Sequence, residues 1–308
     1  MSSTSRPRHF LRLADLSLDE HTALRARAIV LKAERKTGRV HETMRGKTLA
    51  LVFEKSSTRT RASFEAGMKQ LGGEVIVLDA QGSQIGRGEP IEDTSRILAS
   101  YTDIMMLRTF GDDRLQRFAD YSRVPVINGL SDGAHPVQLL ADLMTVHEEF
   151  GTLRGLKYAY VGDASSNMGR SWCEAAALFD FELTLACPQG YEPPEADIEA
   201  SRGLARIVRN PVEAVRGADV INTDVWTSMG QEAETARRLA AFQGFCVDDA
   251  LLSHASARAI VLHCLPAHRG EEISAEVLEG PRSRVFQQGE NRMHAQKALL
   301  ELMVNANA

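Results

Sequence analysis

Short apolar runs of strand length alternate with helix-like segments along the whole chain of 308 residues. Strands joined by helices form right-handed βαβ units around parallel sheets, because a twisted strand and its crossover helix pack together in one hand. We therefore predict an α/β fold in which each sheet is mainly parallel and flanked by helices. The runs expected to form strands are residues 48–53, 74–78, 104–107, 124–128, 157–161, 183–187, 220–223 and 260–263.

The chain is longer than most single hydrophobic cores allow and fits two domains of ordinary size. The alternation of strands and helices starts again at residue 157 without repeating the sequence of the first half. We predict two α/β domains that divide near residue 140, with the active site in the cleft between them.

Composition narrows the class of partner. Charged residues make up 25% of the chain and the net charge is only −5, so no bulk field attracts nucleic acid or an anionic membrane surface. No apolar run reaches the ~18 residues that a membrane-spanning helix needs. The Ser- and Arg-rich residues 1–8 are more typical of a short loose tail than of a transit peptide. We expect a cytoplasmic protein with no nucleic-acid or membrane partner.

Motifs for metals and nucleotides are absent from the sequence. The four cysteines are widely spaced without a C-x-x-C pair, which is typical of reduced thiols in a cytosolic protein. His147 and Glu148 begin like the zinc motif H-E-x-x-H, but Gly151 stands where the second histidine is required. The turn at residues 162–169 lacks the glycine spacing of a dinucleotide fingerprint, and the chain has no Walker A loop. We predict no metal and no cofactor, and we exclude nucleotide-dependent kinases and dehydrogenases.

The turn after the first strand is the clearest candidate for a binding site. Residues 55–64 read K-S-S-T-R-T-R-A-S-F and connect an apolar strand to a helix-like segment. Free N–H groups at the start of a helix, hydroxyl groups and two arginines together suit a phosphate dianion. An alternative is that Ser56 or Ser57 only caps the helix while the arginines lie in water. This turn alone does not decide between the two.

Further polar residues follow other strands of the first half. Arg108 ends the strand at residues 104–107, and H-P-V-Q (residues 135–138) follows the strand at residues 124–128. Ligands of open parallel sheets bind outside the carboxyl ends of the strands, so these residues are expected to share a site with the first turn. By itself, His135 would be interpreted as a capping or core histidine.

The second half has its own strand-end clusters. Asn167, in the turn after residues 157–161, could hold a carboxylate or cap the next helix. The segment D-V-W-T-S-M-G (residues 224–230) follows another strand, and H-C-L-P (residues 263–266) ends the last one. Without further information, Cys264 would be interpreted as a small buried hydrophobic residue.

Taken in order, the clusters S-T-R-T-R, S-Q-I-G, Arg108-Thr109, H-P-V-Q, S-N-M-G, D-x-W-x-S-M-G, H-C-L-P and E-N-R-M-H resemble those of the carbamoyltransferase family. The resemblance covers essentially the whole chain, and the ornithine carbamoyltransferases match most closely. S-T-R-T-R and H-P-x-Q mark the carbamoyl phosphate site of that family, whereas S-M-G together with H-C-L-P indicates ornithine. Two small departures, Val137 and Gly289, remove no polar group.

The resemblance implies a carbamoyl phosphate site in the first domain, residues 1–140, which the C-terminal helix 291–308 would rejoin. The phosphate would bind to the S-T-R-T segment, and the carbamoyl end to Arg108 and the H-P-V-Q segment. In the family, a loop like the one containing Gln84 reaches the site of an adjacent subunit, which implies a homotrimer with shared active sites. The residues implied for carbamoyl phosphate are Ser57, Thr58, Arg59, Thr60, Gln84, Arg108, His135, Pro136, Val137, Gln138, Cys264, Leu265 and Arg292.

The second domain, residues 141–290, would bind L-ornithine through Asn167, Asp224, Ser228 and Met229. The δ-amine resembles a lysine amine with a pKa of about 10.4, so it must lose a proton before it attacks. In the family, Asp224 and Cys264 are the candidates for orienting and deprotonating it, the cysteine acting as a thiolate or as a hydrogen-bond partner. The residues implied to be catalytic are Arg108, His135, Asp224, Cys264 and Arg292.

Two alternatives stay open from the sequence. The acceptor could be another amine, such as aspartate or an acylated ornithine, or the chain could be a binding protein that has lost turnover. The sequence also leaves open the direction of the reaction, citrulline synthesis or its phosphorolysis, and any assembly beyond a trimer.

Overall fold

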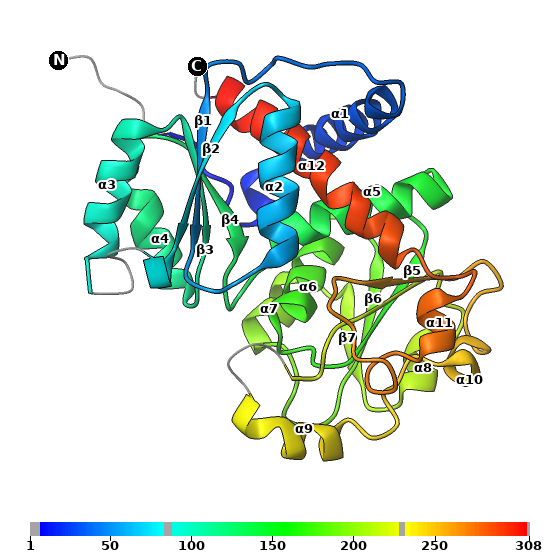
Figure 1. The fold of residues 1–308 in the computed structure, drawn as a ribbon. Coiled ribbons are helices and arrows are strands. Elements are labelled where there is room, and N and C mark those ends of the chain that lie inside the picture. The colour runs from blue at the N-terminus through cyan, green and yellow to red at the C-terminus, as the bar shows by residue number, and fades with distance from the viewer. Residues whose placement is uncertain (1–6, 83–87, 228–231, 307–308) are drawn as a thin grey trace. The chain divides into compact units, whose positions relative to one another are not determined.

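The computed structural model describes residues 7–82, 88–227 and 232–306. Its contacts divide the chain into two compact units, residues 1–140 with 291–308 and residues 141–290. Each unit contains one parallel sheet flanked by helices, which confirms the predicted fold class (Figure 1). The boundaries between the units fall within two helices, α5 (Pro136–Phe150) and α12 (Val285–Asn305).

The first unit contains a four-stranded sheet in the order β2-β1-β3-β4. Crossovers between parallel strands are right-handed. The crossover from β1 to β2 therefore places its helix on one face of the sheet, whereas the crossovers from β2 to β3 and from β3 to β4 run the opposite way across the sheet and place their helices on the other face. Accordingly, α3 and α4 lie on the face opposite to α2 and α12 (Figure 1). The elements are η1 (Leu13–Asp15), α1 (Leu18–Lys36), β1 (Thr48–Phe53), α2 (Thr58–Gln70), β2 (Glu74–Asp79), η2 (Ala80–Gly82), α3 (Ile91–Tyr101), β3 (Ile104–Arg108), α4 (Asp112–Asp120) and β4 (Val126–Leu130).

The second unit contains a five-stranded sheet in the order β7-β6-β5-β8-β9, again with all neighbours parallel. The chain direction across the sheet reverses between β5 and β8, as it does between β1 and β3 in the first unit. The elements are β5 (Lys157–Val161), α6 (Asn167–Phe179), β6 (Glu182–Ala186), α7 (Glu195–Ala200), β7 (Ala205–Val208), α8 (Pro211–Val215), β8 (Val220–Thr223), η4 (Glu232–Glu234), α9 (Thr235–Ala241), α10 (Asp249–Leu252), β9 (Ile260–His263) and α11 (Ala275–Glu279).

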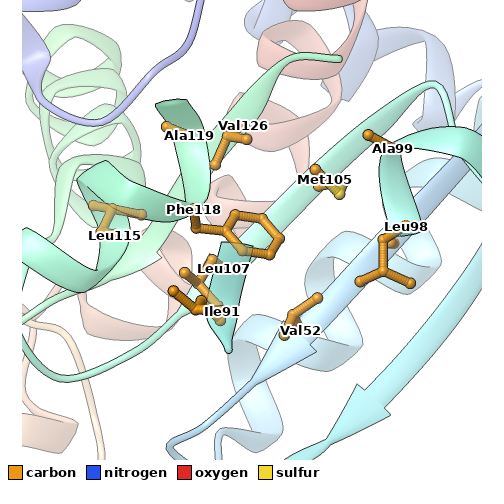
Figure 2. Packing of buried hydrophobic residues seen from close by; sticks show 11 residues of the cluster. Val52, Ile91, Leu98, Ala99, Met105, Leu107, Leu115, Phe118, Ala119 and Val126 are labelled. Carbon is orange, nitrogen blue, oxygen red and sulfur yellow. The ribbon is translucent and has the colours of Figure 1, made fainter. Parts of the chain in front are cut away.

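Alternate residues of the central strands form the core between the first sheet and helices α3 and α4. Phe118 of α4 is fully buried and lies in the middle of this cluster (Figure 2). Leu107 of β3 and Val52 of β1 face it from the sheet, while Ile91 and Leu98 contribute from α3. Burial of one such side chain stabilises the fold by about 1.5–3 kcal/mol. The strand ends, with their polar residues, are thereby held on a rigid sheet.

A local signal placed the start of α1 correctly. The sequence S-L-D-E at residues 17–20 predicts a capping box, and Ser17 and Glu20 form it: each side chain accepts a hydrogen bond from the other residue's backbone N–H. The alternative that Asn167 caps the next helix was wrong, because Ser166 caps α6 through the N–H of Gly169. Among the described residues, no helix is both long and apolar enough to cross a membrane.

Several predicted boundaries were wrong. The fourth strand begins at Val126 rather than residue 124, because Pro125 has no N–H and Val124 is held by the Ser122 hydroxyl. The sixth strand begins one residue earlier than predicted, at Glu182, and ends at Ala186. Strand β7, at the edge of the second sheet, was missed because it has only four residues, of which only Ala205 and Val208 are buried.

Helix α12 also begins at Val285, six residues before the predicted C-terminal helix 291–308. Residues 287–291 are polar, but the side chains of Gln288 and Asn291 have buried partners. Gln288 donates from Nε2 to Asp142 Oδ1 over 2.5 Å, and Asn291 Oδ1 accepts from Lys32 Nζ over 2.7 Å. A helix can therefore continue through this polar segment without exposing it.

Candidate active site

The turn after β1 forms the start of helix α2. Ser57 is the N-cap, and its hydroxyl accepts a hydrogen bond from the N–H of Thr60 over 3.3 Å. The capping interpretation is therefore correct for Ser57. The helix-like sequence predicts a helix over residues 62–71, whereas α2 begins four residues earlier, at Thr58. Arg59 and Thr60 thus lie in the first helical turn, where N–H groups and the helix dipole favour an anion.

Arg292 joins two segments of the first unit that carry predicted site residues. Its Nη1 donates to Gln138 Oε1 and its Nη2 donates to Thr60 Oγ1, both over 2.7 Å. All three residues are buried, with at most 3% of their surface exposed. Gln138 and Thr60 both accept these bonds with their side-chain oxygens, so Arg292 fixes the orientation of both side chains.

Three guanidinium groups act on the buried imidazole of His135. Burial lowers its pKa well below the usual range, and the charges of Arg292, Arg108 and Arg59 lower it further. The imidazole is thus neutral near pH 7. The same three charges make this edge of the sheet a strongly positive site.

Arg108 is held at the carboxyl end of β3 by the neighbouring strand. Its carbonyl accepts the N–H of Glu54, the residue that follows β1. The Glu54 carboxylate in turn accepts the Thr109 hydroxyl and two nitrogens of Arg114, with Arg114 Nε 2.8 Å from Oε1. The negative charge of Glu54 is therefore balanced by Arg114. The edge between β1 and β3, where the sheet reverses its strand order, is where open α/β sheets bind ligands.

The neutral state of His135 gives a prediction for pH titration. In ¹³C-histidine NMR spectra, the signal that disappears in His135→Asn should keep its neutral chemical shift well below pH 6.5. The folded-state pKa is depressed, so the contribution of His135 to stability is present above pH 6.5 and is lost as the pH falls, by up to about 1.4 kcal/mol per pH unit. Titration of this signal near pH 6.5 would contradict the prediction.

In the second unit, the parallel register of β8 and β9 pairs Thr223 with His263. The residues that follow, Asp224 and Cys264, are therefore neighbours. Cys264 Sγ donates a hydrogen bond to Asp224 Oδ1 over 3.0 Å, and the N–H of Val225 donates to the same oxygen over 2.8 Å. Burial raises the pKa of Asp224. The thiol is a donor here, which favours the hydrogen-bond role of Cys264 over the thiolate role.

A buried carboxylate orients the residue before Cys264. His263 Nε2 lies 3.0 Å from Glu272 Oε1, and both side chains are fully buried. The N–H of Leu265 donates to His263 Nδ1 over 2.8 Å, so this nitrogen is an acceptor and the proton resides on Nε2. Leu265 has a left-handed backbone, φ +60°, which this bond helps to hold. Glu272 was not predicted from the sequence, since nothing near it in the chain signals its partner.

Asn167 is the first residue of α6 and lies half-buried at the end of β5, next to the N-cap Ser166. The carboxyl ends of β5 and β8 mark the reversal point of the second sheet, so Asn167 and Asp224 share this edge. Three predicted site residues, Gln84, Ser228 and Met229, lie outside the described residues.

Within the described ranges, two groups of side chains bring possible metal ligands within 4.8 Å of one another. One consists of Asp224, His263 and Cys264, but both nitrogens of His263 already have protein partners. The other consists of His268, Glu271 and Glu272, and a Glu272 oxygen is likewise used by His263 and by the N–H of His268. Binding of a metal by His263 in the first group would require one of its hydrogen bonds to break.

Comparison with known proteins agrees with this arrangement. Residues 8–148 match the family described as "Aspartate/ornithine carbamoyltransferase, carbamoyl-P binding domain", and residues 154–303 match "Aspartate/ornithine carbamoyltransferase, Asp/Orn binding domain". The chain belongs to the aspartate/ornithine carbamoyltransferase family. The resemblance seen in the sequence motifs is thus confirmed at the level of the family.

Curated members of the carbamoyltransferase family include relatives of nearly the same length. The chain is 54% identical over 301 residues to the ornithine carbamoyltransferase of Pelobacter propionicus, covering 96% of this chain and 98% of that one. It is 52% identical over 297 residues to the anabolic ornithine carbamoyltransferase of Pseudomonas aeruginosa, covering 96% and 97%.

Solved structures in the carbamoyltransferase family share the fold. The ornithine carbamoyltransferase of Burkholderia thailandensis aligns with a TM-score of 0.90 at 44% identity, covering 98% of this chain and 100% of that one. The ornithine carbamoyltransferase of Pyrococcus furiosus aligns with a TM-score of 0.91 at 45% identity, covering 96% of each chain.

Proposed function

We propose that this chain transfers the carbamoyl group of carbamoyl phosphate to the δ-amine of L-ornithine, giving L-citrulline and phosphate. The amine nitrogen attacks the carbamoyl carbon directly, the bond from this carbon to the phosphate oxygen breaks, and phosphate leaves with its electron pair. The arrangement of Arg59, Arg108 and Arg292 around a neutral His135 is the observation that carries the proposal, because it suits a dianionic carbamoyl donor.

In this proposal, the start of α2 binds the phosphate through Ser57, Thr58, Arg59 and Thr60. The hydroxyl of Ser57 is used as the helix cap, so its share of the binding would come from its remaining hydroxyl hydrogen and the neighbouring N–H groups. Gln84, Pro136, Val137, Cys264 and Leu265 complete the proposed set of carbamoyl phosphate contacts.

Arg108, His135 and Arg292 would act on the carbamoyl end. Donors placed at the carbonyl oxygen stabilise the negative charge that develops there during attack, by about 2.7–4 kcal/mol for each donor in other acyl-transfer enzymes. A neutral imidazole can donate one N–H without repelling the neighbouring guanidinium groups. Orientation and fixed charges would therefore supply most of the rate enhancement.

For the acceptor, we propose that Asn167, Asp224, Ser228 and Met229 bind ornithine. A buried carboxylate attracts an ammonium group and repels a second carboxylate, so the Asp224–Cys264 pair favours ornithine over aspartate. The relatives named ornithine carbamoyltransferase, which match almost the whole chain, favour the same acceptor. Asp224 would orient the amine with the help of the Cys264 thiol.

The direct test is citrulline formation from carbamoyl phosphate and L-ornithine, with aspartate, putrescine and N-acetylornithine as parallel acceptors. Turnover with ornithine alone is the expected result. Turnover with another acceptor would keep the carbamoyl phosphate site and overturn the proposed acceptor site. Binding of carbamoyl phosphate with no product from any amine would indicate a binding protein.

We further propose that the chain acts in the cytoplasm in arginine synthesis, the role named for the anabolic relative from Pseudomonas aeruginosa. We also propose a homotrimer in which the loop containing Gln84 reaches a neighbouring subunit's site. A cavity of about 710 Å³ beside the edge strand β2, lined by Ser57, Thr58 and Val77 among others, offers space for such a loop next to the start of α2.

Shared sites predict complementation between two defective subunits. Gln84→Ala and Arg292→Ala subunits, unfolded together and refolded as a 1:1 mixture, should regain activity in about a quarter of their sites, because one subunit supplies Arg292 and its neighbour supplies Gln84. Each variant refolded by itself is the control. A mixture no more active than the sum of its components would show that the sites are not shared, and light scattering would report the assembly directly.

A further inference from the structure

Arg238 of helix α9 is a buried arginine outside the residues that the sequence motifs implicate. Only 7% of its side chain is exposed, and its Nη1 donates to Asp163 Oδ2 over 2.7 Å and to the Trp226 carbonyl over 2.9 Å. Its Nε donates to Glu234 Oε2 over 3.2 Å, one helical turn earlier. The guanidinium also lies over the ring of Tyr191, 5.1 Å from its centroid.

The first partner, Asp163, belongs to the turn that carries Asn167. Its Oδ1 accepts the N–H and the hydroxyl of Ser165, over 3.0 and 2.6 Å. The Asp163 carbonyl accepts the hydroxyl of Tyr160, and the same hydroxyl lies 3.2 Å from Ser166 Oγ, the N-cap of α6. The Asp163 side chain thus fixes the residues that lead into Asn167.

The second partner, Trp226, lies two residues after Asp224. Its ring stacks on Phe242 with 5.6 Å between centroids and an interplanar angle of 14°. Tyr191 packs against the same Phe242 at 4.7 Å, and its carbonyl accepts the N–H of Ser165. Arg238 therefore lies within an aromatic cluster that contacts both turns.

The turn after β5 and the turn after β8 are in direct contact with each other. A Cβ atom at Gly162, which has φ +139°, would lie 3.6 Å from Thr223 Oγ1 and 3.7 Å from the Asp224 carbonyl. Thr223 Oγ1 also donates to the Val161 carbonyl over 2.7 Å. The turn after β5 and the turn after β8 are thus packed together, and Arg238 bonds to both.

We propose that Arg238, paired with Asp163, is a positioning residue that sets the spacing between Asn167 and Asp224 and thereby the affinity for the amino-acid acceptor. It acts through the two turns and touches neither substrate. The inference rests on the proposed function, because it takes Asn167 and Asp224 as the groups that bind ornithine. A change at Arg238 should therefore alter acceptor binding and leave the carbamoyl phosphate site of the other unit unchanged.

The test is steady-state kinetics with each substrate varied in turn, using Arg238→Gln, Arg238→Lys and Asp163→Asn. The glutamine variant should raise KM for ornithine at least tenfold while KM for carbamoyl phosphate stays within twofold. Arg238→Lys keeps the charge but cannot reach Asp163 and the Trp226 carbonyl with one planar group. Its KM for ornithine should therefore lie between that of the wild type and that of Arg238→Gln. Asp163→Asn should resemble Arg238→Gln.

Arg258 provides a control for the loss of an arginine–aspartate pair in the same unit, with a side chain that is more exposed than that of Arg238. It pairs with buried Asp219 over 2.9 Å and lies 5.1 Å from the ring centroid of Phe150, but at the amino end of β8. Arg258→Gln should leave both KM values unchanged. Circular dichroism and carbamoyl phosphate binding check that each variant folds, and Asp163→Asn carries the test if Arg238→Gln does not fold.

The outcomes separate the two proposals. Equal rises in both KM values, or a lower melting temperature with an unchanged KM for ornithine, would give Arg238 a structural role only and overturn the inference. Absence of citrulline formation by the wild-type chain would overturn the proposed function instead. A wild-type chain that turns over ornithine, with variants that lose affinity for ornithine alone, is the result expected if both are correct.

Discussion

Replacing Arg292 by lysine is expected to lower kcat/KM for carbamoyl phosphate by about 10² to 10³-fold, the range seen when one oxyanion donor is removed. The guanidinium donates to Gln138 and to Thr60 at once, each over 2.7 Å. A lysine ammonium keeps the positive charge but is a single point and cannot reproduce the planar fork. Steady-state kinetics with carbamoyl phosphate varied, together with its binding constant from calorimetry, would measure the effect.

Arg27→Lys is the control for the Arg292 variant. Arg27 makes a comparable two-point contact within the same unit, with Glu301 Oε2 and Oε1 at 2.6 and 2.9 Å, and Glu301 is also on helix α12. This control should lower stability without changing kcat/KM. An Arg292→Lys enzyme with wild-type kinetics would mean that Arg292 only holds α12 against helices α2 and α5.

Replacing Asp224 by asparagine is expected to lower kcat/KM for ornithine by about 10² to 10³-fold, in line with the loss of one partner from a buried charge pair. The asparagine oxygen can still accept the Cys264 thiol, so the change removes mainly the negative charge. Carbamoyl phosphate binding should change little, because the residues around His135 belong to the other unit and the bond from Cys264 is kept. The measurement is kinetics with ornithine varied, beside calorimetry with carbamoyl phosphate.

Asp219→Asn is the control for the Asp224 variant. Asp219 is buried like Asp224 but precedes β8 instead of following it, and it accepts Arg258 Nε and the N–H of Lys157. Asp219→Asn should affect stability and not the affinity for ornithine.

The raised pKa of Asp224 also predicts an acid limb in the pH profile of kcat/KM for ornithine. As the pH falls, the Asp224 carboxylate becomes protonated at a higher pH than an ordinary aspartate would, and ornithine binding weakens. Persistence of that limb in Asp224→Asn would assign it to another group.

The effects of the substitutions at Arg292 and Asp224 should be separable, because each should alter the kinetics with a different substrate. A change at Arg292 acts on the donor, and a change at Asp224 acts on the acceptor. If both variants lost affinity for both substrates to the same extent, the proposed division of labour between the two units would be wrong. Double variants would then be needed to find which residues act together.

Local features of the sequence determined much of the fold. The alternation of apolar runs with helical segments predicted parallel sheets, and Ser17 with Glu20 predicted the start of α1, since a capping box involves only neighbours in the chain. Polar clusters after strands were expected to gather at one edge, because parallel strands end on the same side of a sheet. The sequence motifs also identified the family.

Contacts between residues far apart in the chain depended on the tertiary structure. Arg292 and Thr60 are separated by 232 positions, and Arg238 and Asp163 by 75. No periodicity or local propensity encodes such a pair, because it forms only when sheet order and helix placement are set. The beginning of α12 at Val285 has the same cause, since its polar side chains are helical only where Asp142 and Lys32 satisfy them. The sequence determined which residues are available for chemistry, and the packing of distant segments decided which of them meet.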